Sequence, residues 1–207
     1  MNIDIIGLLI SFGLLMIVMT VHEFAHGWVA YKLGDSTAKD SGRLTLNPLA
    51  HIDPVGTVLL PLILFISTNG RFVFGAAKPV PINYRALNNP KRDIIWIGAS
   101  GPAANFLFAF LSSLVYRFIP VAEFGRFLLE NLIVINVVLG VFNLIPIPPL
   151  DGSRIVMGLL PGKLAYRYAM IERYGFFIIM ALIFFRIMDI FIWPIVGLII
   201  NYMGVAS

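Results

Sequence analysis

The chain has 207 residues, of which 59% are hydrophobic and only 13% are charged. Its mean hydropathy of +0.90 lies far above that of soluble globular domains. The composition excludes an ordinary soluble protein and predicts one that resides in a membrane. The length suits a compact bundle of several spans, and we expect a single domain over residues 1–207 without an additional soluble module.

The net charge is +4, and the basic residues fall in short loops beside long apolar segments. This placement is typical of topology signals in membrane proteins and argues against a nucleic-acid partner. The chain has no cysteine, so disulfides and thiolate metal sites are excluded. Any transition-metal site must therefore use His, Asp or Glu.

The first predicted element is a membrane helix over about residues 3–33, which ends at Gly34-Asp35. The next apolar run, residues 55–67, is shorter than the about 20 residues of an ordinary span, which predicts a re-entrant or tilted segment. A β-forming run follows at residues 71–74, inside the basic loop 69–93.

Two further apolar helices are expected over about residues 94–119 and 127–145. The last apolar region, residues 174–203, contains Arg186, Asp189 and Pro194, and it predicts one broken helix or two short ones. The fold class is therefore an all-α membrane protein: a polytopic transmembrane helix bundle with a short re-entrant or β-hairpin element.

Two histidines and a glutamate stand at the end of the first apolar helix, in the order His22-Glu23-Phe24-Ala25-His26. Imidazoles at i and i+4 lie on one helical face and can bind one zinc ion, which needs a third protein ligand and an open position for water. Glu23 would then act as the base that activates water. The competing interpretation is a chance pattern of packed residues, but an ionisable group is costly in an apolar helix.

The third ligand is less clearly specified by the sequence. Asp151 is favoured because it follows residues 143–150, where three prolines end the preceding helix and are expected to hold the backbone extended at membrane depth. Asp151 could instead cap a helix that begins near Ser153. The other candidates are His51, Asp53, Asp35 and Asp40.

If residues 22–26 and Asp151 share a metal, the two helices that precede them must run parallel. This holds if residues 55–67 dip into the membrane and return, which leaves both basic loops on one face. The positive-inside rule then places that face, with the metal site, toward the cytoplasm. Arg186 and Asp189, at i and i+3, are expected to form an ion pair, and His51 is expected to be solvated in its polar loop.

The segment His22-Glu23-Phe24-Ala25-His26, together with Asn143-Leu144-Ile145-Pro146-Ile147-Pro148-Pro149-Leu150-Asp151-Gly152, resembles the site-2 protease family of intramembrane zinc metalloproteases. The segments Gly101-Pro102-Ala103-Ala104-Asn105, Leu46-Asn47-Pro48-Leu49 and Lys78-Pro79-Val80-Pro81-Ile82-Asn83 resemble the same family, so the similarity covers most of the chain.

The resemblance implies one Zn²⁺ per chain, bound by His22, His26 and Asp151, with Glu23 as the catalytic base. It also implies that Asn143 stabilises the oxyanion or positions the substrate. The partners would be the lipid bilayer and a transmembrane protein substrate, and the location a multi-pass protein of the plasma membrane. The PDZ and nucleotide-sensing modules of many family members do not fit within this length.

Two other functions use the same residues. A metal transporter would employ the His and Asp groups as a transit site, and a non-catalytic membrane protein would hold a structural zinc while it binds transmembrane helices. Neither gives Glu23 a chemical role. For Asn105, oxyanion stabilisation and interhelical hydrogen bonding are equally compatible with the sequence.

Overall fold

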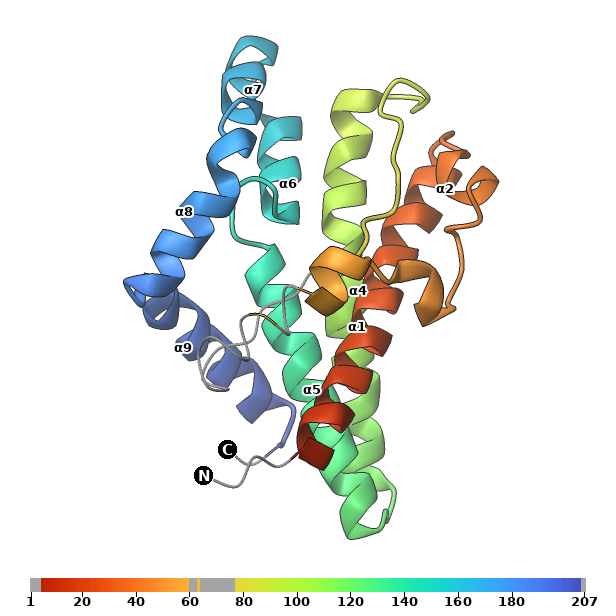
Figure 1. Cartoon of the computed structure of the whole chain (residues 1–207), viewed down its shortest axis with the longest axis vertical. Coiled ribbons are helices and arrows are strands. Elements are labelled where there is room, and N and C mark those ends of the chain that lie inside the picture. Colours follow the sequence, from red (N-terminus) through yellow and green to blue (C-terminus); the bar gives the residue numbers. More distant parts are fainter. Residues whose placement is uncertain (1–4, 60–62, 64–76, 206–207) are drawn as a thin grey trace.

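The structure, a computed structural model, describes residues 5–59, 63 and 77–205 (Figure 1). Within these residues the regular elements are all helical, which confirms the predicted all-α class. They are α1 (Ile5–Lys32), α2 (Thr37–Asp40), η1 (Pro48–His51), η2 (Pro54–Leu59), α4 (Pro90–Phe118), α5 (Glu123–Asn143), α6 (Asp151–Leu159), α7 (Gly162–Ala169), α8 (Glu172–Phe184) and α9 (Ile187–Tyr202).

Two expected elements fall largely or wholly outside the described residues. The β-forming run at 71–74 is not described, and of the re-entrant candidate at 55–67 the structure gives only residues 55–59 and 63. Residues 54–59 form a single π-helical turn, η2.

Within the part of the chain that the structure describes, three helices are long and apolar enough to cross a membrane: α1 from Leu9, α4 and α5. The last apolar region forms two helices, α8 and α9, which are bent by 78° at a short break and together make at most one further span. Arg186 occupies the break with a φ of 57°, and its Nε donates to Asp189 Oδ2 at 2.8 Å. The expected ion pair is confirmed, and of the two expected forms the region adopts two short helices.

The α4 helix begins at Pro90, four residues before the apolar run that predicted it. Proline is favoured at a first helical position, where its missing N–H costs no hydrogen bond. The Asp93 carboxylate also accepts the N–H of Asn89, at 2.7 Å, so the polar residues before Ile94 stabilise the helix start. The boundary was missed because these residues carry no apolar periodicity.

The α4 helix lies at the centre of the bundle and packs against α1, α5 and α6 (Figure 1). Figure 1 also shows α1 and α5 running in the same direction, with α4 antiparallel to both. The helix that carries the His pair, α1, and the helix that precedes Asp151, α5, are therefore parallel, as a shared metal requires.

Close contact between α4 and α6 fixes the position of Asp151. A Cβ on Gly98 would lie 2.9 Å from the Asp151 carbonyl oxygen and 3.0 Å from Arg154 Cβ. Gly158 on α6 would likewise meet the Lys91 carbonyl oxygen at 2.8 Å. Glycines on both helices thus let the backbones touch, as small residues do between membrane helices.

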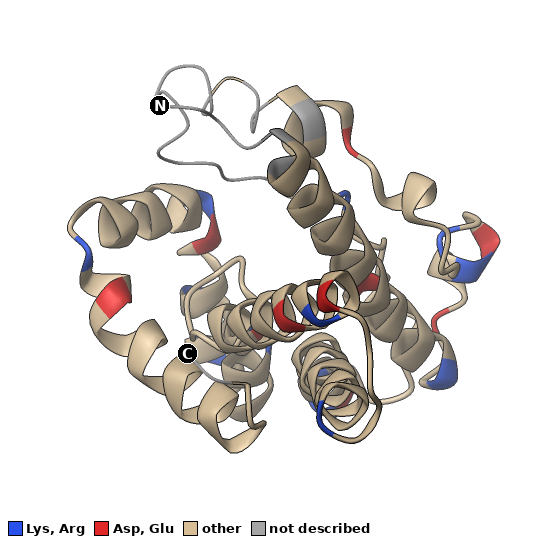
Figure 2. Cartoon of the chain, turned by 90° about the horizontal axis from the view of Figure 1, so that it is seen from below, with Lys and Arg blue, Asp and Glu red and all other residues tan. Residues whose placement is uncertain are grey.

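The surface of the bundle is apolar along its length. Large side chains such as Phe118, Phe177 and Phe184 are at least two-thirds exposed, which suits contact with lipid. Charged residues lie mainly in loops and near helix ends (Figure 2). The expectation of a membrane-embedded bundle is consistent with both features.

Candidate active site

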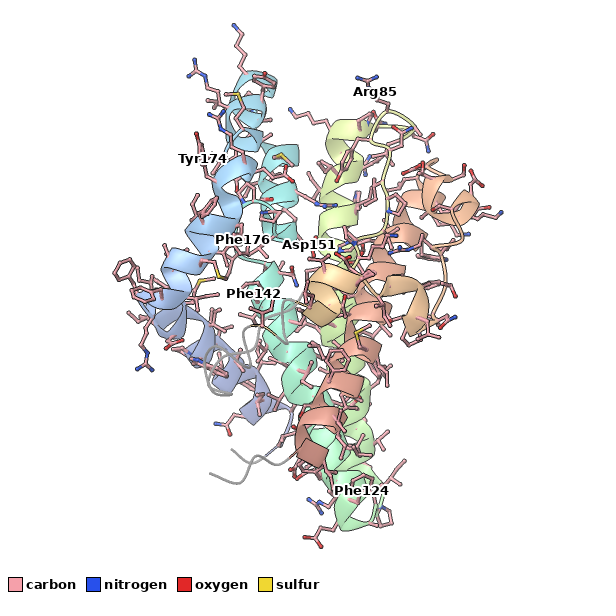
Figure 3. The ribbon with its side chains drawn as sticks, viewed as in Figure 1. Arg85, Phe124, Phe142, Asp151, Tyr174 and Phe176 are labelled. Carbon is pink, nitrogen blue, oxygen red and sulfur yellow. The ribbon has the colours of Figure 1, made fainter. Side chains whose placement is uncertain are left out.

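Three ionisable side chains from two distant parts of the chain meet inside the bundle. His22 and His26 lie on one face of α1, and Asp151 is the first residue of α6. His22 Nε2 is 3.0 Å from Asp151 Oδ2, His26 Nε2 is 3.1 Å from the same oxygen, and the two nitrogens are 3.0 Å apart. All three residues are buried. Figure 3 shows Asp151 well inside the bundle, between Arg85 near one end and Phe124 near the other.

Hydrogen bonds on the far side of each ring determine where the lone pairs point. His26 Nδ1 donates to the Ile97 carbonyl oxygen at 2.7 Å, and His22 Nδ1 donates to Asn105 Oδ1 at 2.8 Å. A neutral imidazole that donates through Nδ1 carries its lone pair on Nε2. In this neutral form two nitrogen lone pairs and a carboxylate oxygen converge on one point, where they repel each other unless a metal ion, or a proton on one of the rings, lies between them.

The donor set fits zinc. Zinc binds histidine nitrogen at about 2.0–2.1 Å and carboxylate oxygen at about 2.0–2.2 Å in a tetrahedral arrangement, which sets ligand atoms about 3.3 Å apart. The observed separations of 3.0–3.1 Å are close to this spacing. Among the described residues, these three form the one group of His, Asp or Glu ligand atoms close enough to share an ion.

The floor of the site is the backbone of α4. A Cβ on Gly101 would lie 2.5 Å from His26 Nε2 and 2.6 Å from His22 Nε2, so a side chain at this position would fill the space that the ligand atoms share. Ile97, Gly101 and Asn105 are spaced four residues apart and lie on one face of α4. Along this face, the Ile97 carbonyl oxygen accepts from His26, Gly101 leaves open space beside the two Nε2 atoms, and the Asn105 amide oxygen accepts from His22.

Asp151 does not cap α6. The helix starts at Asp151 itself, Leu150 occupies the N-cap position, and no side chain caps the helix through a hydrogen bond. The carboxylate contacts the histidines instead. Of the two interpretations left open by the sequence, the structure therefore favours contact with the two histidines over capping.

The Pro-rich segment before Asp151 is not extended, so that expectation was wrong. Successive turns are closed by bonds from Ile147 N–H to the Ile145 carbonyl, at 2.8 Å, and from Leu150 N–H to the Ile147 carbonyl, at 2.9 Å. Prolines exclude helix, but they also suit tight turns, and turns satisfy the backbone groups locally. The short path they make returns the chain to α4 after α5 ends.

Glu23 is half-buried and lies beside His22 on α1. Its Oε2 accepts the backbone N–H of Val80 at 2.8 Å. Asn143 ends α5, and its Nδ2 donates to the Leu139 carbonyl oxygen of the same helix at 3.0 Å. Among the described residues, Asn105 rather than Asn143 therefore contacts a metal-ligand candidate, His22.

The other third-ligand candidates lie elsewhere. Asp35 accepts hydrogen bonds from Thr37 and from Asn83 N–H, Asp40 accepts one from Ser36, and Asp53 accepts one from Val55 N–H. His51 is fully buried, and its Nε2 bonds to the Thr45 carbonyl oxygen at 2.9 Å. The prediction that His51 is solvated was wrong, because its loop folds back and encloses the ring.

Residues 121–185 match the peptidase family M50. Over 192 residues the chain is 36% identical to "Putative zinc metalloprotease YwhC" of Bacillus subtilis, and the alignment covers 88% of this chain and 84% of that protein. The chain belongs to peptidase family M50.

Two further relatives of this M50 peptidase carry similar names. It is 29% identical over 191 residues to "Putative zinc metalloprotease Rip2" of Mycolicibacterium smegmatis, across 91% of this chain and 72% of the relative. It is 29% identical over 157 residues to "Zinc metalloprotease MJ0392" of Methanocaldococcus jannaschii, across 76% of this chain and 36% of that protein. No solved structure matches it.

The family confirms the resemblance to site-2 proteases that the motifs predicted. This M50 peptidase is an intramembrane zinc metalloprotease and an integral membrane protein, and its cofactor is Zn²⁺. The transporter and the non-catalytic binding protein are not favoured.

We expect Gly101→Ala to abolish zinc binding, because the added methyl group would occupy the space between His22 Nε2 and His26 Nε2. Metal analysis of the purified variant would show a loss of most of the zinc. The matched control is Gly13→Ala on α1, where an added Cβ meets no atom within 4 Å. Full zinc content in Gly101→Ala would contradict the position assigned to the ion.

We expect Asn105→Leu to weaken zinc binding about 10- to 100-fold, the usual cost of losing a partner that orients a histidine ligand. Competition with a chelator in detergent would measure the dissociation constant. Asn131→Leu serves as the control, because within the described residues the Asn131 side chain bonds only to the Phe127 carbonyl of its own helix. An unchanged affinity in Asn105→Leu would show that the tautomer of His22 is set in another way.

Proposed function

We propose that His22, His26 and Asp151 hold the zinc ion of this protease and that Glu23 is its general base. One observation carries the proposal: the three ligand atoms converge within 3.1 Å of one another, with both histidine lone pairs directed inward. The fourth tetrahedral position is left for water or substrate, as catalytic zinc sites require.

In this arrangement zinc would act as a Lewis acid that polarises the scissile carbonyl and lowers the pKa of water. Glu23 accepts the proton as water attacks the carbonyl carbon, and it later returns that proton to the leaving amine. The two imidazoles are held by the hydrogen bonds from their Nδ1 atoms to Asn105 and to the Ile97 carbonyl oxygen. Asp151 is held by its position as the first residue of α6.

We also propose that Asn143 donates a hydrogen bond to the developing oxyanion or positions the substrate. Its amide nitrogen carries two hydrogens, and the bond to Leu139 uses one of them. A neutral amide can stabilise negative charge without adding a positive charge to the site.

The substrate class that we propose is a transmembrane segment of another membrane protein. An apolar pocket of about 360 Å³ lies between α5 and α9, beside the turns that lead to Asp151. Apolar side chains line it, among them Leu144, Pro146 and Ile195. A lipid-embedded segment could enter such a pocket without exposing polar groups.

We propose that the protein lies in the plasma membrane and that its catalytic site opens toward the cytoplasmic face. We also propose that residues 1–207 act as one domain. Between His22 and the end of α1 at Lys32 the helix rises about 15 Å, so the site lies below the membrane surface. Basic residues lie at that end of the bundle: Lys32 ends α1, Lys91 lies in the first turn of α4, and Arg85 lies near the same end in Figure 3. The positive-inside rule assigns this end to the cytoplasm.

The test combines metal content with proteolysis in wild type, Glu23→Gln and Asp151→Ala. We expect about one zinc per chain in the wild type and in Glu23→Gln, and a marked loss in Asp151→Ala. Cleavage of a co-reconstituted membrane substrate should fall by at least about 100-fold in Glu23→Gln, because the general base is gone. Undiminished zinc in Asp151→Ala, or undiminished cleavage in Glu23→Gln, would remove the corresponding role.

The orientation can be tested by cysteine labelling, because the natural chain has no cysteine. Ser36 and Asn88 are exposed near the C-terminal end of α1, whereas Ala122 is exposed in the turn between α4 and α5. We expect a membrane-impermeant maleimide to label Ser36→Cys and Asn88→Cys in inside-out vesicles and Ala122→Cys in right-side-out vesicles. The reverse pattern would overturn the cytoplasmic assignment.

A further inference from the structure

The carboxylate of Glu23 has a backbone partner that its own helix does not supply. Its Oε2 accepts the N–H of Val80 at 2.8 Å, across 57 positions of the sequence. Val80 is buried, and its side chain lies against α1, where a Cβ on Gly27 would be 3.1 Å from Val80 Cγ1. The contact is therefore part of a packed interface between α1 and the segment 77–83.

The local sequence leaves Val80 as the one backbone donor in residues 79–81. Pro79 and Pro81 carry no N–H, and a residue that precedes proline is driven away from helical backbone toward extended conformations. Val80 follows one proline and precedes another, so the direction of its N–H is restricted before Glu23 accepts it.

Hydrogen bonds on both sides of Val80 hold the segment against the rest of the fold. Lys78 N–H donates to the His51 carbonyl at 2.9 Å, and Arg43 Nη2 donates to the Lys78 carbonyl at 2.7 Å. Farther along, Asn83 N–H donates to Asp35 Oδ2 at 2.7 Å. The donor is thus held by the fold without help from Glu23.

A glutamate side chain has three rotatable bonds, and a half-buried one beside a metal site can adopt several orientations. Tying Oε2 to a fixed amide removes most of this freedom and leaves Oε1 to accept a proton. Holding a reacting group in position can change rates by large factors, and a misplacement of about 1 Å can cost about 100-fold.

We infer that the Val80 amide is a positioning group that holds Glu23 in the orientation needed for proton transfer. The inference rests on the proposed function, because it takes Glu23 as the base. It assigns the Lys78-Pro79-Val80-Pro81 segment a role in the chemical step through one N–H, separate from any contact with substrate.

Val80→Pro removes the N–H and keeps an apolar ring in a segment already shaped by prolines. We expect its kcat to fall about 10- to 100-fold, with KM and zinc content unchanged. Val80→Ala keeps the N–H and loses only side-chain packing, so its kcat should remain well above that of Val80→Pro at equal zinc content. Equal kcat values for Val80→Pro and wild type, or an equal loss in Val80→Pro and Val80→Ala, would overturn the inference.

A double-mutant cycle separates positioning from a general effect on the fold. Glu23→Asp keeps a carboxylate but is one methylene shorter, so it cannot hold the same bond to Val80 and also reach the same point. We expect Val80→Pro to cause little further loss in the Glu23→Asp background, because the bond is already gone. Independent, multiplicative losses would count against the inference.

Hydrogen exchange gives a readout that does not depend on whether Val80→Pro folds. Residues 79–81 contain one exchangeable backbone hydrogen, that of Val80. In zinc-loaded protein we expect this hydrogen to exchange at least about 10-fold faster in Glu23→Ala than in wild type. Equal exchange rates in wild type and Glu23→Ala would show that the hydrogen bond from Val80 N–H to Glu23 does not form in the detergent-solubilised protein.

These outcomes separate the inference from the function on which it rests. If Glu23→Gln retains full cleavage, Glu23 is not the base and both fail. If Glu23→Gln is inactive while Val80→Pro has wild-type kcat, the proposed function stands and the positioning role of Val80 is excluded.

Discussion

The structure depends on the convergence of three electron-rich atoms at one point inside an apolar bundle. Two imidazole nitrogens and a carboxylate oxygen lie within 3.1 Å of each other there, an arrangement that is unfavourable unless a metal ion, or a proton on one of the rings, lies between them. The surrounding elements keep them in place: α1 sets the spacing of the histidines, α6 supplies the carboxylate, and one face of α4 holds both rings from behind.

A second constraint acts on the non-helical backbone that lies at membrane depth. An unpaired N–H or carbonyl is costly in hydrocarbon, so irregular segments must satisfy these groups within the protein. The Pro-rich turns before Asp151 do so with local bonds, such as that from Leu150 to Ile147, and by having three residues without an N–H. The segment 77–83 follows the same rule at three positions, since the N–H groups of Lys78, Val80 and Asn83 bond to His51, Glu23 and Asp35.

Side-chain chemistry could be predicted from the sequence, whereas backbone contributions could not. The spacing of His22 and His26 indicated the metal site, and the position of Asp151 after a Pro-rich break indicated the third ligand candidate. The sequence did not reveal the open space at Gly101 or the amide of Val80, because neither involves a reactive side chain. His51 was misjudged for a similar reason: its burial comes from tertiary folding of a polar loop, which local composition does not report. One sequence pattern could have predicted part of this arrangement: residues 97, 101 and 105 are spaced four apart, which places them on one face of a helix, and they include a glycine and an asparagine.

The separation of the proposed ligands along the chain has a consequence for biogenesis. His22 and His26 leave the ribosome long before Asp151, which is 125 residues away from His26. If Asp151 is the third ligand, the nascent protein cannot close its metal site until α4 has inserted and α6 has docked against it. Hydrolytic activity would then appear only after the bundle is assembled, so partly inserted chains in the translocation machinery would be unable to cleave the membrane proteins being made beside them.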